Sequence, residues 1–298
     1  METYYNIHNI VKIKVEDPKE YDYYLRYFKV DKLENVDIEI LKGNNSLKIE
    51  NGKITAFVRD NELCLNALIE YILLQKGYTF IHAAGVSYKD KGFVFPAGPG
   101  VGKTLLISRL RERTKFFADD YLILGEDGTM FSYPMDFSIY DYHFDFFEEL
   151  KQTDNVRKIK KAKYEKPIVS VIRYLPMKRW IKRLAKFLRY DYLQGGKYLK
   201  VPAKELIKNF GGKVKTNYGF FLVKGNNFKI ERIERTDSID KEIVEILQSE
   251  WKKTLPYIPL DFNKAREIIK KGLNNAILYR VNLSRNNINK LEEFLWNL

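Results

Sequence analysis

Three glycines within five residues, Gly98, Gly100 and Gly102, constrain the fold of this chain more than any other feature. Glycine has no Cβ and adopts backbone conformations that are closed to other residues, so this segment can curl tightly. The apolar run at residues 93–95 predicts a strand before it, and the apolar residues of 103–113 recur at helical spacing after it. The sequence therefore predicts a strand, a glycine-rich loop and a helix in direct succession.

This loop has the spacing of a phosphate-binding loop. Its residues are Ala97, Gly98, Pro99, Gly100, Val101, Gly102, Lys103 and Thr104. In such a loop the backbone N–H groups and the following helix end face the phosphates, the lysine reaches the β- and γ-phosphates, and the threonine hydroxyl binds Mg²⁺. The pattern normally opens with glycine, and Ala97 is an accepted variant. We predict ATP and Mg²⁺ as ligands; the alternative is a glycine-rich turn with a chance Lys-Thr pair.

Two adjacent acids, Asp119 and Asp120, follow the apolar residues 116–118. One carboxylate can meet the metal held by Thr104, for which we assign Asp120, and the other can accept the proton of an attacking hydroxyl. Successive strand residues point to opposite sides, so both acids can face one site only if the backbone bends there. The alternative is a solvated turn.

His82 precedes the small residues Ala83, Ala84 and Gly85, which suggest tight packing. Taken alone, this pattern favours a hydrogen-bonded structural role for His82.

The order of these motifs resembles the HPr kinase/phosphorylase family and its HPr-kinase-related relatives, which share a nucleotide-binding core with phosphoenolpyruvate carboxykinases. The resemblance covers residues 78–134, from His-Ala-Ala-Gly-Val through the glycine-rich loop to Phe-Ala-Asp-Asp-Tyr, and is weaker at 195–197 and 218–223. It implies that His82, Lys103, Asp119 and Asp120 are catalytic residues around the reacting phosphate. The chain lacks the glycine-rich signature and the arginine that follow the core in true HPr kinases, which argues for a different acceptor. It is also much shorter than the carboxykinases.

The positive charge of the chain lies in one segment. Residues 151–208 contain 18 Lys or Arg and 4 Asp or Glu, whereas the formal charge of the whole chain is +13. A predicted helix at 177–190 carries apolar residues on one face and basic residues around the rest. Three interpretations stay open: a solvated structural helix, binding of RNA or another polyanion, and docking on anionic membrane.

The remaining pattern predicts an α/β (α+β) fold, in which a mixed β-sheet flanked by helices carries the phosphate loop. Residues 1–76 form a strand-rich region plus a helix, and residues 77–298 form the kinase-like core with the basic segment. Alternating stretches at 11–15, 36–41, 46–49 and 54–58 predict a small antiparallel layer. Helices are expected at 62–75, 103–113, 238–251, 262–272 and 286–296, and strands at 79–87, 93–95, 116–124, 219–223 and 276–281.

The composition limits which disulfide and metal sites the chain can form and where in the cell we expect it. Cys64 is the only cysteine, which excludes an internal disulfide, and only His8, His82 and His143 are available to a zinc site. The sequence shows no export signal and no apolar run of membrane-spanning length, so we expect a cytoplasmic protein.

We therefore expect an ATP-dependent kinase that transfers the γ-phosphate to a hydroxyl of an unidentified acceptor: a protein serine, RNA or a small molecule. One alternative is an ATP-gated nucleic-acid-binding protein without phosphoryl transfer. Another is a nucleic-acid-binding protein with a degenerate nucleotide site.

Overall fold

The computed structural model describes residues 2–58, 65–140, 143, 146–147, 150, 190–191, 196–234, 240, 243 and 258–298. The chain divides into two units, which are described separately. The first comprises Met1–Met135 and Asn209–Leu298, and the second is Asp136–Lys208. The predicted boundary between residues 76 and 77 stays a prediction.

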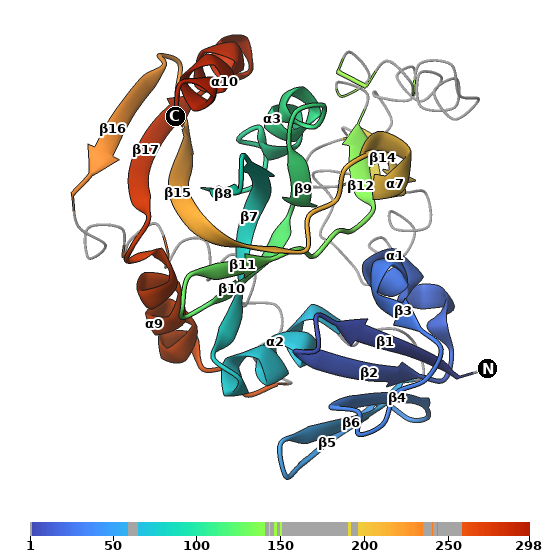
Figure 1. The fold of residues 1–298 in the computed structure, drawn as a ribbon. Coiled ribbons are helices and arrows are strands. Elements are labelled where there is room, and N and C mark those ends of the chain that lie inside the picture. The colour runs from blue at the N-terminus through green and yellow to red at the C-terminus, as the bar shows by residue number, and fades with distance from the viewer. Residues whose placement is uncertain are drawn as a thin grey trace, which may run out of the picture. The chain divides into compact units, whose positions relative to one another are not determined.

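The N-terminal part of the first unit is a six-stranded sheet in the order β3-β1-β2-β4-β6-β5 (Figure 1). Buried and more exposed residues alternate along β1, β2 and β4, so one face packs on the core. The strands are β1 (Thr3–Ile7), β2 (Val11–Val15), β3 (Lys29–Val30), β4 (Ile38–Lys42), β5 (Ser46–Glu50) and β6 (Lys53–Val58).

The expectation of an antiparallel layer here is wrong. β4 pairs in parallel with both β2 and β6. The chain makes the first of these pairings because it crosses from β2 to β4 through η1 (Pro18–Glu20), α1 (Asp22–Leu25), η2 (Arg26–Phe28) and β3. A connection of that length permits parallel pairing, which a tight turn does not.

A larger, eight-stranded sheet forms the rest of the first unit, in the order β11-β10-β7-β8-β15-β17-β16, with β9 also paired to β7. Strand β11 pairs with both β10 and β15, so part of the sheet closes on itself. β15 is parallel to β8 and β17. The strands are β7 (Tyr78–Tyr88), β8 (Lys91–Pro96), β9 (Lys115–Ala118), β10 (Tyr121–Gly125), β11 (Thr129–Phe131), β15 (Lys213–Lys224), β16 (Lys229–Ile233) and β17 (Ile277–Leu283).

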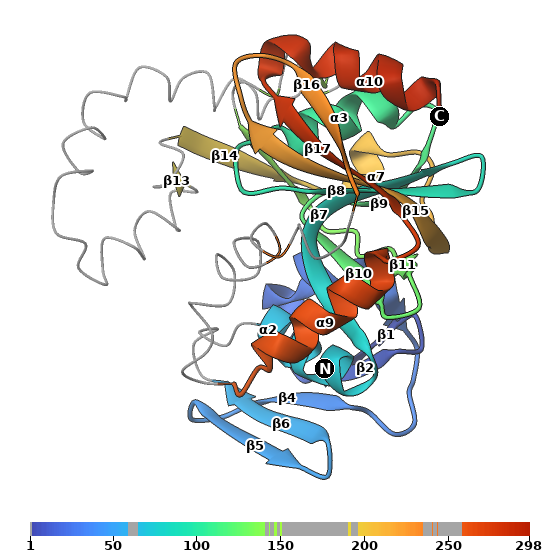
Figure 2. The same cartoon turned by 90° about the vertical axis from the view of Figure 1, so that its left-hand side faces the viewer.

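Four helices of the first unit agree with the predicted ones within a few residues: α2 (Leu65–Gln75), α3 (Lys103–Leu110), α9 (Phe262–Leu273) and α10 (Ile288–Trp296). α3 and α10 lie together above β8, β15 and β17, whereas α9 runs beside β7 and β10 (Figure 2). The Asp261 side chain caps α9 by accepting a hydrogen bond from the Lys264 backbone. Cys64 and most of the predicted helix at 238–251 lie outside the described residues.

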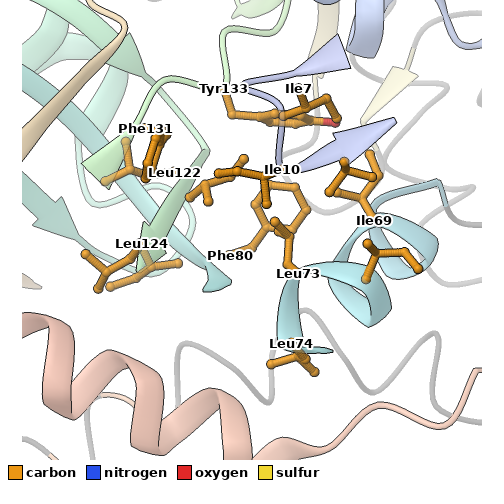
Figure 3. Packing of buried hydrophobic residues seen from close by; sticks show 14 of the residues in the cluster. Ile7, Ile10, Ile69, Leu73, Leu74, Phe80, Leu122, Leu124, Phe131 and Tyr133 are labelled. Carbon is orange, nitrogen blue, oxygen red and sulfur yellow. The ribbon is translucent and has the colours of Figure 1, made fainter. Parts of the chain in front are cut away.

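One hydrophobic core joins the two sheets of the first unit (Figure 3). Ile7 and Ile10 reach it from the first sheet, and Leu73 comes from α2. Phe80 and Leu122 come from β7 and β10, and all five side chains are buried. This shared burial stabilises β7, which carries His82, from both sides.

The second unit contains a three-stranded antiparallel sheet and a short helix. Its strands are in the order β12-β14-β13. They are β12 (Phe137–Tyr140), β13 (Tyr190–Asp191) and β14 (Gly196–Val201), and the helix is α7 (Ala203–Leu206). The predicted basic helix at 177–190 lies outside the described residues, apart from residue 190.

The architecture is therefore mixed α/β, with mixed sheets and few helices, as the α+β expectation required.

Candidate functional site

The glycine-rich loop leaves β8 and enters α3 directly. Gly100 and Gly102 have φ angles of +76° and +123°, conformations that favour glycine, and Gly102 is the N-cap of α3. A Cβ added to Gly98 or Gly100 would meet no atom within 4 Å. The glycines therefore serve backbone curvature and an open approach to the loop, which are the two requirements of a phosphate cradle.

Lys103 turns back into the loop. It is 6% exposed, and its Nζ donates to the backbone oxygen of Ala97 at 3.0 Å and that of Gly98 at 3.4 Å. It also lies 3.0 Å from Nε2 of His82. The ammonium group is thus held at the inner side of the loop.

The antiparallel pairing of β7 with β8 brings His82 to the loop, where the Ala97 backbone N–H donates to the His82 backbone oxygen at 3.3 Å. In the pairing of β7 with β10, His82 lies opposite Tyr121. The two rings stack with centroids 5.8 Å apart, and His82 is 8% exposed. An ammonium group can only donate, so Nε2 accepts the bond from Lys103 and the ring proton is on Nδ1.

The two aspartates lie at a bend between β9 and β10. Both strands pair with β7, β9 at residues 85–87 and β10 at residues 78–82. The bend that would let both acids face one site is thus present. The backbone N–H of Ala83 donates to the backbone oxygen of Asp120 at 3.1 Å and stabilises this bend.

The aspartates have different neighbours. Asp119 Oδ2 accepts a hydrogen bond from the Thr104 hydroxyl at 2.8 Å. Asp120 is 51% exposed, and its Oδ1 lies 3.4 Å from His82 Nε2 and 4.0 Å from Lys103 Nζ. Asp119 thus hydrogen-bonds the Thr104 hydroxyl, whereas Asp120 is exposed to solvent and lies beside His82 and Lys103.

All the residues singled out from the sequence are therefore brought together: His82, Lys103, Thr104, Asp119 and Asp120. Within the described ranges no group of three or more His, Cys, Asp or Glu could hold a metal ion by itself. The oxygens of Thr104 and Asp119 fit Mg²⁺, a hard cation that binds one or two protein groups and takes its other ligands from phosphates and water. The assignment of Asp120 as the metal ligand stays a prediction, although Asp119 lies nearer Thr104.

A buried carboxyl lies behind the site. Glu70 of α2 accepts a hydrogen bond from the Phe80 backbone at 2.8 Å and one from the Thr79 hydroxyl. Burial raises its pKa to about 8, more than these two hydrogen bonds lower it. Glu70 therefore joins α2 to β7 two residues before His82. The sequence alone does not single out Glu70, since a lone acid in an apolar helix gives no specific signal.

The loops after β15 and β17 also belong to this edge of the sheet. The backbone N–H of Gly225 donates to the Leu283 oxygen at 3.0 Å, and a Cβ on Gly102 would lie 3.8 Å from Ile288 Cδ1. Neither loop is recognisable from the sequence, because only the register of three parallel strands brings them beside residues 97–104.

No protein-family model matches this sequence, and the search of curated proteins finds no match. Among the described residues, no helix is both long and apolar enough to cross a membrane.

Proposed function

We propose that this protein is an ATP-dependent phosphotransferase of the HPr-kinase-like type, which transfers the γ-phosphate to a hydroxyl of an acceptor. The observation that carries the proposal is the position of Lys103, His82 and Asp120 within 4.0 Å of one another, next to a glycine-rich loop. A phosphate-binding loop alone would support only binding. An exposed carboxylate beside the loop lysine supports transfer.

The loop N–H groups and Lys103 would bind the phosphates. The bonds of Lys103 to the Ala97 oxygen and to His82 would be exchanged for bonds to phosphate oxygens, which attract an ammonium group more strongly. Because the Thr104 hydroxyl donates to Asp119, we propose that Thr104 and Asp119 would hold Mg²⁺, in place of the Asp120 expected from the sequence. When bound, the cation offsets the charge of the phosphate oxygens.

Asp120 is the proposed general base. In the transfer, the acceptor oxygen forms a bond to the γ-phosphorus while the bond between that phosphorus and the bridging oxygen breaks, so that ADP leaves. The hydroxyl proton passes to the Asp120 carboxylate. His82, 3.4 Å from that carboxylate, would position it.

The test is incubation of the purified protein with γ-labelled ATP, Mg²⁺ and a total cell extract, followed by separation into protein, RNA and metabolites. Label is expected in one fraction with the wild type and not with Lys103→Ala or Asp119→Ala. Full transfer by either variant would refute the site assignment.

A second candidate function is ATP-gated binding of RNA or another polyanion without transfer. The observation that favours it is the excess of basic residues in 151–208, with 18 Lys or Arg against 4 Asp or Glu. Such binding would weaken steeply with salt and change with ATP. Covalent labelling of any acceptor would exclude it as the sole function.

A further inference from the structure

The parallel strands β8, β15 and β17 end at the same edge of the large sheet, and each is followed by a loop there. The registers of β15 with β8 and β17 establish this, and a bridge between Ala97 and Leu222 extends the first pairing to the start of the phosphate loop. In open sheets, ligands bind outside the carboxyl ends of parallel strands. This edge is therefore where the remainder of a bound triphosphate would lie.

Val223 occupies this edge next to the loop. It is 40% exposed, although its neighbour Leu222 is 4% exposed. Only one other large hydrophobic side chain of the described residues is exposed, Phe210. Since Leu222 bridges Ala97, Val223 follows at the level of Gly98, where an added Cβ would meet no atom within 4 Å. An exposed apolar side chain thus comes one residue after the bridge between β15 and the start of the loop.

An amide lies on the other side of Val223. Asn282 of β17 is its register partner, so the two side chains lie on the same face of the sheet. The turn after β15 packs closely on this amide, because a Cβ on Gly225 would lie 3.0 Å from Asn282 Cβ. A side-chain amide carries both donors and an acceptor, which is the combination that reads the edge of a purine base.

Adjacent strands are separated by about 4.8 Å, so Leu222 lies roughly one strand spacing from its bridge partner Ala97, and β17 with Asn282 lies roughly one spacing further along the edge. The order along the edge is then phosphate loop, apolar side chain, amide. This order matches a nucleotide that extends from its phosphates to its base.

We propose that Val223 and Asn282 form the base subsite of the nucleotide site, with Val223 packing against the ring face and Asn282 hydrogen-bonding its edge. The ligand is a purine nucleoside triphosphate. The inference rests on the proposed function, because it takes the phosphates to lie on residues 97–104.

The experiment compares binding of Mg-ATP and of Mg-tripolyphosphate, which lacks ribose and base, by titration calorimetry. The wild type is expected to bind ATP more tightly than tripolyphosphate. Val223→Ser and Asn282→Ala should each weaken ATP binding about tenfold, in the range of losses seen for base–side-chain contacts, with tripolyphosphate binding unchanged within twofold. Phe210→Ala, the other exposed apolar side chain, is the matched control and should change neither.

Lys103→Ala distinguishes the base subsite from the phosphate site of the proposed function, because this substitution should weaken binding of both ATP and tripolyphosphate. Unchanged ATP binding in both edge variants, or an equal loss for ATP and tripolyphosphate in folded protein, overturns the subsite and leaves the proposed function standing. If the wild type binds neither ATP nor tripolyphosphate, both the base subsite and the proposed function are overturned. Circular dichroism melting of each variant establishes that it is folded.

Discussion

Lys103 and His82 share a hydrogen bond, with the lysine Nζ 3.0 Å from the histidine Nε2. The same Nε2 lies 3.4 Å from Asp120 Oδ1. While the nitrogen accepts from the lysine, it cannot donate to the carboxylate. Movement of Lys103 toward a phosphate would therefore leave His82 and Asp120 to interact with each other.

The first prediction concerns His82. His82→Ala should lower kcat of phosphoryl transfer about tenfold or more, since Asp120 loses the neighbour that positions it, while the Kd for ATP changes less than threefold. Labelled-transfer kinetics and calorimetry measure the two quantities. His8→Ala, a substitution in another partly buried histidine of the same unit, is the control. A large rise in Kd with unchanged kcat would instead assign His82 to binding.

The second prediction separates the two aspartates. Because Asp119 accepts from Thr104, Asp119→Asn should raise the Mg²⁺ concentration that gives half-maximal activity. Asp120→Asn should lower kcat by about a hundredfold at saturating Mg²⁺, since an amide cannot accept the proton. Titration of activity with Mg²⁺ checks both. The opposite pattern would make Asp120 the metal ligand and Asp119 the base.

The third prediction concerns stability and pH. Burial raises the pKa of Glu70 from 4.5 to about 8, so the folded chain keeps a proton that the unfolded chain releases above pH 4.5. Its contribution to the free energy of unfolding is complete below pH 4.5 and is lost as pH rises toward 8. Glu70→Gln keeps a neutral group that can accept a hydrogen bond from the Phe80 backbone. The free energy of unfolding of the variant, relative to that of the wild type, should therefore rise by on the order of 3 kcal/mol between pH 5 and pH 8.

Urea unfolding at pH 5, 6.5 and 8 measures that difference. Glu126→Gln, in an exposed ion pair with Lys271, serves as the control and should change the free energy of unfolding by no more than about 1 kcal/mol. A constant difference for Glu70→Gln would contradict the raised pKa.

The fourth prediction uses two adjacent glycines. A Cβ on Gly211 would lie 2.0 Å from Phe117 Cε2, within the buried core, whereas a Cβ on Gly212 would meet no atom within 4 Å. Gly211→Ala should therefore lower the free energy of unfolding by about 1–3 kcal/mol through overpacking, and Gly212→Ala by much less. Denaturant unfolding of both variants provides the comparison. Equal losses would mean that Phe117 moves aside at little cost.

Local sequence signals predicted the part of the fold nearest the site. The predicted strands at 79–87 and 93–95, the loop glycines and the helical spacing after them agree with β7, β8 and α3, because each of these signals depends on neighbours in the chain. The sheet order did not follow from such signals, since the parallel pairing of β4 and the three partners of β15 depend on distant segments. Likewise, motif order placed Asp119 and Asp120 near Thr104, but only the bend shows which of them touches it.

The pairing of β11 with β15 has a consequence for association between molecules. It joins two strands of the large sheet to each other and leaves β16 at the end of the strand order. An uncovered end strand can pair with a strand of another chain. β16 carries Lys229, Glu231 and Arg232 as exposed residues, which oppose such pairing, so substituting apolar residues for Glu231 and Arg232 would favour aggregation.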